Sequence, residues 1–153
     1  MKPTVVTWIL VLFGLALILL PMIYAQGLML TQPESRKTRD ILIGEGEDWR
    51  DKTHFRTATG YAWADYIVWF PLLLAGSIGV LRGKRWGYAL WLASGSISIY
   101  INIVLWFSER EYVLPSQGPL IYYSYYWGFF IYWGIAAVVY SIFRLTKRRA
   151  LYR

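Results

Sequence analysis

The sequence predicts an all-α integral membrane protein, an antiparallel bundle of four transmembrane helices. Hydrophobic residues make up 57% of the 153-residue chain and charged residues only 16%, whereas soluble domains carry about a quarter charged residues. The charges are also segregated, so that long stretches of the chain have none. These stretches are long enough to cross a bilayer, which takes about 20 mostly apolar residues.

Four segments meet this criterion, and together they form a single membrane domain. The predicted spans cover residues 4–24, 61–81, 86–107 and 120–143, with outer loops at 25–60 and 108–119. The first apolar stretch is too long for the core of a signal peptide, and isoleucine is a poor third residue before a cleavage site. We therefore expect this stretch to remain as a span.

The positions of the basic residues predict the orientation, because short cytoplasmic loops are enriched in Lys and Arg. Alternate ends of the four spans carry nine bases and no acid: Lys2, Arg82, Lys84, Arg85, Arg144, Lys147, Arg148, Arg149 and Arg153. All nine acids fall toward the other side. We expect both termini to be cytoplasmic in a multi-pass protein of a bacterial or archaeal cell membrane. The basic excess then reflects topology, and we expect no nucleic-acid partner.

Several kinds of chemistry are excluded or lack a signature. The chain has no cysteine and one histidine, His54, which excludes disulfides, thiolate nucleophiles, cysteine-ligated clusters and bis-histidine haem within one chain. It contains no phosphate-binding glycine loop and no GxSxG nucleophile motif. We expect no cofactor.

The third predicted span carries a stripe of small and polar residues at helical spacing. Its members are Gly87, Trp91, Ser94, Ser98 and Asn102, and Glu109 lies seven residues further on. Helices in membranes associate through small and polar residues, so the stripe should face the interior. It serves either as packing with interhelical hydrogen bonds or as the polar wall of a cavity. Ala75 and Gly79 form a small-xxx-small pair on the second span.

Asp65 is an acid inside the second predicted span, four residues from its outer end. Acids within membranes are costly and generally functional. At this shallow depth, Asp65 either reaches water, caps the helix or belongs to a site. Pro21 and Pro71 should kink the first two spans, and such kinks can open a cavity.

The outer loop contains the charged segment EGEDWRDKTHFR, residues 45–56. Its alternating charges predict a short surface helix in which Asp48 pairs with Lys52. Asp51 and His54 share a face of that helix, so they are weak candidates for metal ligands. No recognised metal-binding spacing accompanies them, and we expect no metal site.

The polar and aromatic features converge near the outer leaflet, where we expect any pocket to lie. The candidate ligand-binding residues are Asp65, Ser98, Asn102, Tyr122 and Tyr126. We expect a binding or accessory subunit that holds a lipid or hydrophobic ligand or joins a larger membrane complex. Its partners would be membrane lipids, other membrane subunits or copies of itself. One alternative is an enzyme for a lipid-phase substrate, in which Asp65 or Glu109 is the acid or base and His54 assists. Another is an oligomeric transporter or channel.

Overall fold

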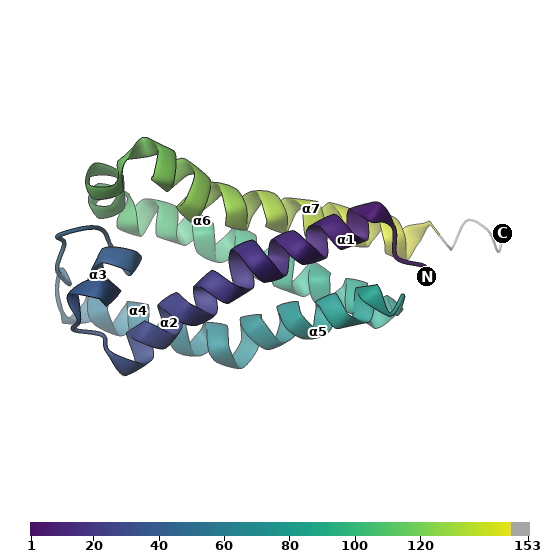
Figure 1. Ribbon diagram of the computed structural model, residues 1–153, viewed down its shortest axis with the longest axis horizontal. Helices are drawn as coiled ribbons and strands as arrows, with labels where there is room; N and C mark the ends of the chain where they lie inside the picture. Colours follow the sequence, from purple (N-terminus) through teal and green to yellow (C-terminus); the bar gives the residue numbers. More distant parts are fainter. Residues whose placement is uncertain (148–153) are drawn as a thin grey trace.

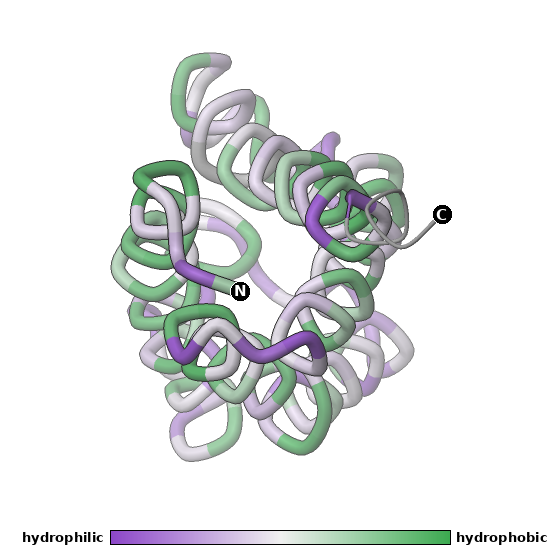
Figure 2. The backbone as a smooth tube through the Cα atoms, turned by 90° about the vertical axis from the view of Figure 1, so that its right-hand side faces the viewer, coloured by the Kyte–Doolittle hydropathy of each residue, from purple (hydrophilic) through white to green (hydrophobic). Residues whose placement is uncertain are grey.

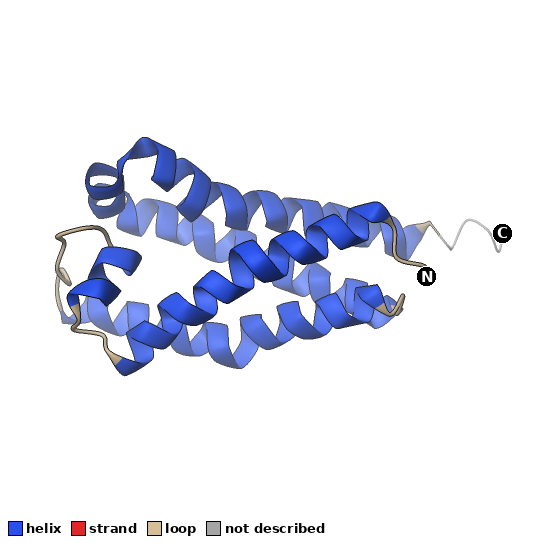
Figure 3. Ribbon diagram, viewed as in Figure 1, coloured by secondary structure: helices blue, strands red, loops and turns tan. Residues whose placement is uncertain are grey.

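The computed structural model describes residues 1–147, and every regular element in this range is a helix (Figure 3). The π-helical segments η1, η2 and η3 join neighbouring α-helices without a break. In chain order the elements are α1 (Val5–Leu12), η1 (Phe13–Leu19), α2 (Leu20–Thr31), α3 (Arg36–Leu42), α4 (Lys52–Ala64), η2 (Asp65–Trp69), α5 (Phe70–Leu81), α6 (Arg85–Ile121), η3 (Tyr122–Gly128) and α7 (Phe129–Thr146).

Three of the resulting helices are long and apolar enough to cross a membrane: Val5–Thr31, Lys52–Leu81 and Arg85–Thr146. The third is not straight, because Gly118 has φ 80° and ψ 164°, a conformation open mainly to glycine. The chain reverses there, and α7 returns beside α6 (Figure 1).

Several helices extend beyond the predicted spans. The first helix continues to Thr31, the second begins at Lys52 as one helix with its apolar part, and the predicted loop 108–119 is helical apart from Gly118. Hydropathy marks only the apolar part of a helix, whereas the helical backbone hydrogen bonds continue until a capping residue or a glycine ends them. The predicted Asp48–Lys52 pair does not form. The Asp48 carboxylate instead lies 2.6 Å from Arg39 Nη1.

Polar side chains cap the helix starts that follow non-helical segments. Thr4, Ser35 and Asp51 have extended backbones and accept backbone N–H groups of α1, α3 and α4 respectively. Each cap satisfies a donor that the helix itself leaves unpaired. These caps therefore set where the three helices begin.

Both prolines that we expected to kink the spans lie two residues after the end of a π-helical turn. Pro21 follows η1 and Pro71 follows η2, and the N–H groups of Leu20 and Phe70 bond to carbonyls five residues back. Proline lacks an N–H and clashes with the preceding turn of an α-helix. The wider turn accommodates this defect, and at η2 its first residue is Asp65.

The N-terminus and the turn between α5 and α6 lie at one end of the molecule (Figure 1). The Met1 amino group bonds to the Gly83 carbonyl, and Arg144 Nη2 donates to the Lys2 carbonyl at 2.6 Å. Figure 2 looks onto this end, with hydrophilic residues at the N-terminus and hydrophobic residues along the helices behind it. The opposite end holds α3 and the turn between α6 and α7.

Three buried tryptophans connect different helices through their indole N–H groups. Trp69 donates to the Ser94 carbonyl at 3.1 Å, Trp91 to Ser77 Oγ at 3.2 Å, and Trp133 to the Leu10 carbonyl at 3.0 Å. The side chains of all three are at most 2% exposed. Each ring fills interior volume while its one polar atom finds a partner on another helix.

The stripe predicted on the third span does face the interior, because its members Gly87, Trp91, Ser94, Ser98 and Asn102 are all buried. Its first residue forms the tightest contact between α5 and α6. A Cβ atom on Gly87 would lie 2.4 Å from backbone atoms of Gly79 and Val80. Only glycine at this position allows the two backbones to approach so closely.

Replacing Gly87 with alanine should therefore force α5 and α6 apart and destabilise the protein by about 1–3 kcal/mol, as overpacking does elsewhere. Thermal unfolding of purified protein in detergent measures the loss. The matched control is Gly60→Ala, because Gly60 is an exposed α4 residue with open space around it. That change should leave stability the same or raise it by up to about 1 kcal/mol. Equal stabilities for both variants would contradict the contact.

Candidate functional site

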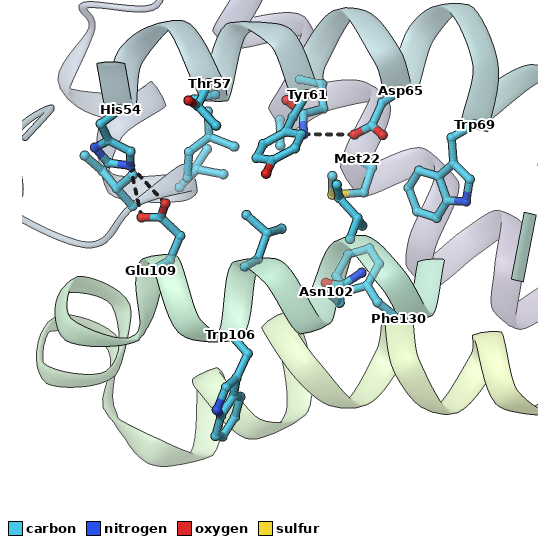
Figure 4. Close-up of a pocket in the computed structure, with 18 of the residues that line it drawn as sticks. Met22, His54, Thr57, Tyr61, Asp65, Trp69, Asn102, Trp106, Glu109 and Phe130 are labelled. Atoms are coloured by element: carbon cyan, nitrogen blue, oxygen red, sulfur yellow. Dashed lines mark hydrogen bonds and ion pairs between the residues drawn. The ribbon is translucent and has the colours of Figure 1, made fainter. Parts of the chain in front are cut away.

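A cavity of about 110 Å³ lies at the end of the molecule away from the N-terminus, between α2, α3 and α4–η2 on one side and α6 on the other (Figure 4). Its walls are mainly apolar. Aliphatic side chains come from α2, α3 and α6, and the aromatic side chains are Trp49, Tyr61, Trp69, Trp106, Tyr122 and Phe130.

Asp65 supplies a carboxyl group to this cavity and is only 9% exposed. Gln26 on α2, itself 7% exposed, donates from Nε2 to Asp65 Oδ2 at 3.1 Å. Within residues 1–147 no other hydrogen bond and no cation reaches this carboxyl group. A carboxylate has room for about four hydrogen bonds, so Asp65 is buried with most of its acceptor capacity unused.

Asn102 and Tyr61 supply further polar atoms. Asn102 is 4% exposed, and its Nδ2 donates to the Ser98 carbonyl one turn back at 2.8 Å. That bond fixes the amide orientation and leaves the side-chain oxygen without a donor among the described residues. Tyr61 extends from α4 into the space between Asp65 and Glu109 (Figure 4).

His54 and Glu109 close the other end of the cavity. His54 Nε2 lies 3.0 Å and 3.1 Å from the two Glu109 carboxylate oxygens, and both side chains are largely buried. His54 Nδ1 accepts the backbone N–H of Arg50 at 3.2 Å. Because Nδ1 is the acceptor, the proton must sit on Nε2, where it is donated to Glu109. Both imidazole nitrogens are therefore engaged within the protein.

The His54–Glu109 contact belongs to a larger attachment at this end. We define the cap as α3 together with residues 43–51, and it supplies Ile41, Leu42, Ile43 and Trp49 to the cavity wall. Arg50 Nη2 donates to the Ser108 carbonyl at 3.0 Å, and the Arg50 guanidinium lies 3.7 Å from the Tyr112 ring centre. Gln117 Nε2 donates to the Asp40 carbonyl at 3.0 Å. These contacts hold the cap against the C-terminal part of α6.

Asp51 does not combine with His54 as a metal site. Asp51 is the N-cap residue of α4, and its carboxylate accepts the His54 backbone N–H at 2.8 Å. This hydrogen bond lowers the pKa of Asp51. Among residues 1–147, no group of three or more His, Asp and Glu side chains is placed to hold a metal ion.

The structure brings together five of the predicted site residues. His54, Asp65, Asn102, Glu109 and Tyr122 all line this cavity. Ser98 does not line it, because its hydroxyl donates to the Phe130 carbonyl at 2.9 Å between α6 and α7. The Tyr126 side chain lies outside the described residues.

Sequence reasoning missed Gln26, the cap and the deep aromatic wall formed by Trp69. Gln26 is a polar residue at the end of a nearly featureless apolar stretch, so the signal was present once the helix was known to reach Thr31. The position of the cap carries no comparable signal, because it depends on contacts between segments far apart in the chain.

No protein-family model, curated protein or solved structure shows detectable similarity to this chain. Function must therefore be argued from the cavity and its residues.

Replacing Glu109 with alanine should loosen the cap, because it removes the charged partner of a largely buried imidazole. Hydrogen bonds to charged groups contribute about 1.5–3 kcal/mol, so amide exchange across residues 43–54 should accelerate at least about tenfold. Hydrogen–deuterium exchange with mass spectrometry reads this directly. Glu111→Ala, at an exposed position two residues away on α6, is the control and should leave exchange unchanged. Equal exchange in both variants would show that the contact does not hold the cap.

The start of α4 should weaken in acid. The pKa of Asp51 is lower in the folded protein than in the unfolded chain. The stabilisation by its N-cap hydrogen bond is therefore fully present above the unfolded-state pKa and is lost as pH falls through the folded-state pKa. Intrinsic-rate-corrected amide exchange of residues 53–55, followed from pH 6 to pH 3, should show this loss in the wild-type protein. Asp51→Asn keeps a capping side chain without a charge and should remove most of the pH dependence. An unchanged pH profile in that variant would refute the assignment.

Proposed function

We propose that the protein crosses the membrane four times, with both termini in the cytoplasm and the cavity in the outer half of the bilayer. The reversal at Gly118 supports four crossings, because it divides the third apolar helix into α6 and α7. The basic residues Lys2, Arg82, Lys84 and Arg144 belong to the end that carries the N-terminus and the α5–α6 turn. Such residues favour the cytoplasmic side.

We further propose that the protein binds a small hydrophobic or amphiphilic molecule taken from the membrane. The carrying observation is the cavity, with aromatic and aliphatic walls and a few polar atoms at fixed positions. Ligand sites commonly combine these features. A volume of about 110 Å³ approaches the roughly 150 Å³ of an apolar cavity that accepts a single benzene ring. The part of the ligand inside is thus about one ring or a few methylene groups.

The same geometry gives less support to acid–base catalysis. Glu109 contacts His54, and Asp65 lies eleven positions after His54 on the same helix, roughly 16 Å away at a rise of 1.5 Å per residue. A general acid and base must both lie within hydrogen-bond reach of the reacting group. The two carboxyl groups are better placed to contact different parts of a bound molecule.

Native mass spectrometry of protein extracted gently from its own membrane tests the proposal. The wild-type protein should carry a discrete small-molecule adduct. Ala58→Phe should remove it, because Ala58 lines the cavity and the added ring would fill the space. Ala64→Phe is the matched control, since it places the same ring at an exposed position of the same helix and should retain the adduct.

Two results would refute binding in this cavity. One is an adduct that survives Ala58→Phe as well as it survives Ala64→Phe, because the molecule would then be bound elsewhere. The other is an assembly with different protein chains and no small adduct, which would make the protein an accessory subunit.

A further inference from the structure

The cavity wall contains acidic residues but no Lys or Arg, whereas basic residues outnumber acidic ones in the whole chain. The chain has 16 Lys and Arg against 9 Asp and Glu, a formal net charge of +7. The cavity wall nevertheless contains two acids, Asp65 and Glu109, and no Lys or Arg. Of the nearby bases, Arg50 lies against Tyr112 and Arg39 against Asp48, while Arg110 lies 5.5 Å from the ring centre of Trp106, a residue of the wall. The cavity wall thus contains carboxyl groups without a basic Lys or Arg side chain, within a protein of net positive charge.

Five side chains of the wall each donate an N–H group within the protein: Gln26 to Asp65, His54 to Glu109, Asn102 to Ser98, Trp49 to Pro33 and Trp69 to Ser94. The Tyr61 hydroxyl group on the same wall has no hydrogen-bond partner among residues 1–147. The Asp65 carboxyl group and the Asn102 side-chain oxygen keep unused acceptor capacity. Both residues are at least nine-tenths buried, so the wall offers two buried acceptor groups to a ligand that donates hydrogen bonds.

The aromatic lining favours a cation as well. Tyr61, Trp69, Trp106, Tyr122 and Phe130 surround the same space. Aromatic faces attract cations, and sites for quaternary ammonium and other amine ligands combine such rings with a desolvated environment. A buried carboxyl group without a cationic partner is costly in an apolar interior. A bound cation would supply the missing partner.

We propose that the cavity selects hydrophobic cations, meaning an amine or ammonium group attached to an aromatic ring or short apolar chain, with Asp65 as the counter-ion. This inference rests on the proposed binding function and names its ligand class. The ammonium group donates to Asp65 and to the Asn102 oxygen, while the apolar part contacts Ile101 and Leu105 on α6. Anionic amphiphiles such as fatty acids should bind more weakly, because they would bring a third carboxyl group beside Asp65 and Glu109.

Three probes of the same size and shape test the charge preference: 4-phenylbutylammonium, 4-phenylbutan-1-ol and 4-phenylbutanoate. Binding is measured by equilibrium dialysis against wild-type protein in nanodiscs of phosphatidylcholine, a lipid without net charge. Empty nanodiscs and the Ala58→Phe protein correct for partition into lipid. The ammonium should bind at least about tenfold more tightly than the alcohol, and the carboxylate more weakly than either.

Two variants locate the preference. Asp65→Asn keeps the size of the side chain and should reduce ammonium affinity to that of the alcohol, while alcohol affinity changes less than about threefold. Glu111→Gln makes the same change in net charge at an exposed site outside the cavity and should preserve the preference. The probe series on the wild-type protein requires no variant to fold, so it decides the question by itself.

The outcomes separate the two proposals. Equal binding of ammonium and alcohol, or tighter binding of the carboxylate, overturns cation selection and leaves the hydrophobic binding site intact. A preference that survives in Asp65→Asn overturns the role of Asp65 as counter-ion. Absence of specific binding for all three probes, together with no adduct on the native protein, overturns both proposals.

Discussion

The close approach of α5 and α6 at Gly79 and Gly87 is the constraint on which the rest of the structure depends. Along the two helices away from the α5–α6 turn, the facing side chains become larger. Gly76 faces the Trp91 ring, and beyond it the Trp69 ring faces the α6 backbone. Side chains of increasing size hold two helices progressively further apart. The helices therefore touch near the α5–α6 turn and diverge toward the other end, where the cavity occupies the space between α4 and α6.

A second constraint is the cost of polar atoms in an apolar interior, and it shapes the chemistry of the cavity. Several buried N–H donors bond inside the protein, as the indole of Trp69 and the amides of Gln26 and Asn102 illustrate. The π-helical turn before Pro71 begins at Asp65, whose carboxyl group faces the cavity with one neutral partner. The unused acceptor capacity of Asp65 and Asn102 links the packing to the proposed selectivity.

The cap completes the cavity from outside the apolar part of the chain. Its residues are polar enough to remain in water, yet Ile43 is 2% exposed and lines the cavity. The cap contacts α6 through Arg50 with Ser108 and through Gln117 with Asp40, and the His54–Glu109 pair joins α4 to α6 beside it. Such a surface segment opens at lower cost than buried helices, so ligand exchange by way of the cap is compatible with rigid packing of α5 against α6.

The sequence by itself determined the helical class, the apolar segments and the inward face of α6, and it included Asp65, Asn102 and Glu109, which line the cavity, among the candidate site residues. These features follow from composition and from the 3.6-residue period, which are local properties of the chain. Only the tertiary structure decided that Gln26 meets Asp65 and that His54 meets Glu109. It also decided where the helices end and that Ser98 bonds to α7 away from the cavity. The reason is physical: these contacts join residues more than 30 positions apart, and the distance between two helices is set by the side chains packed between them.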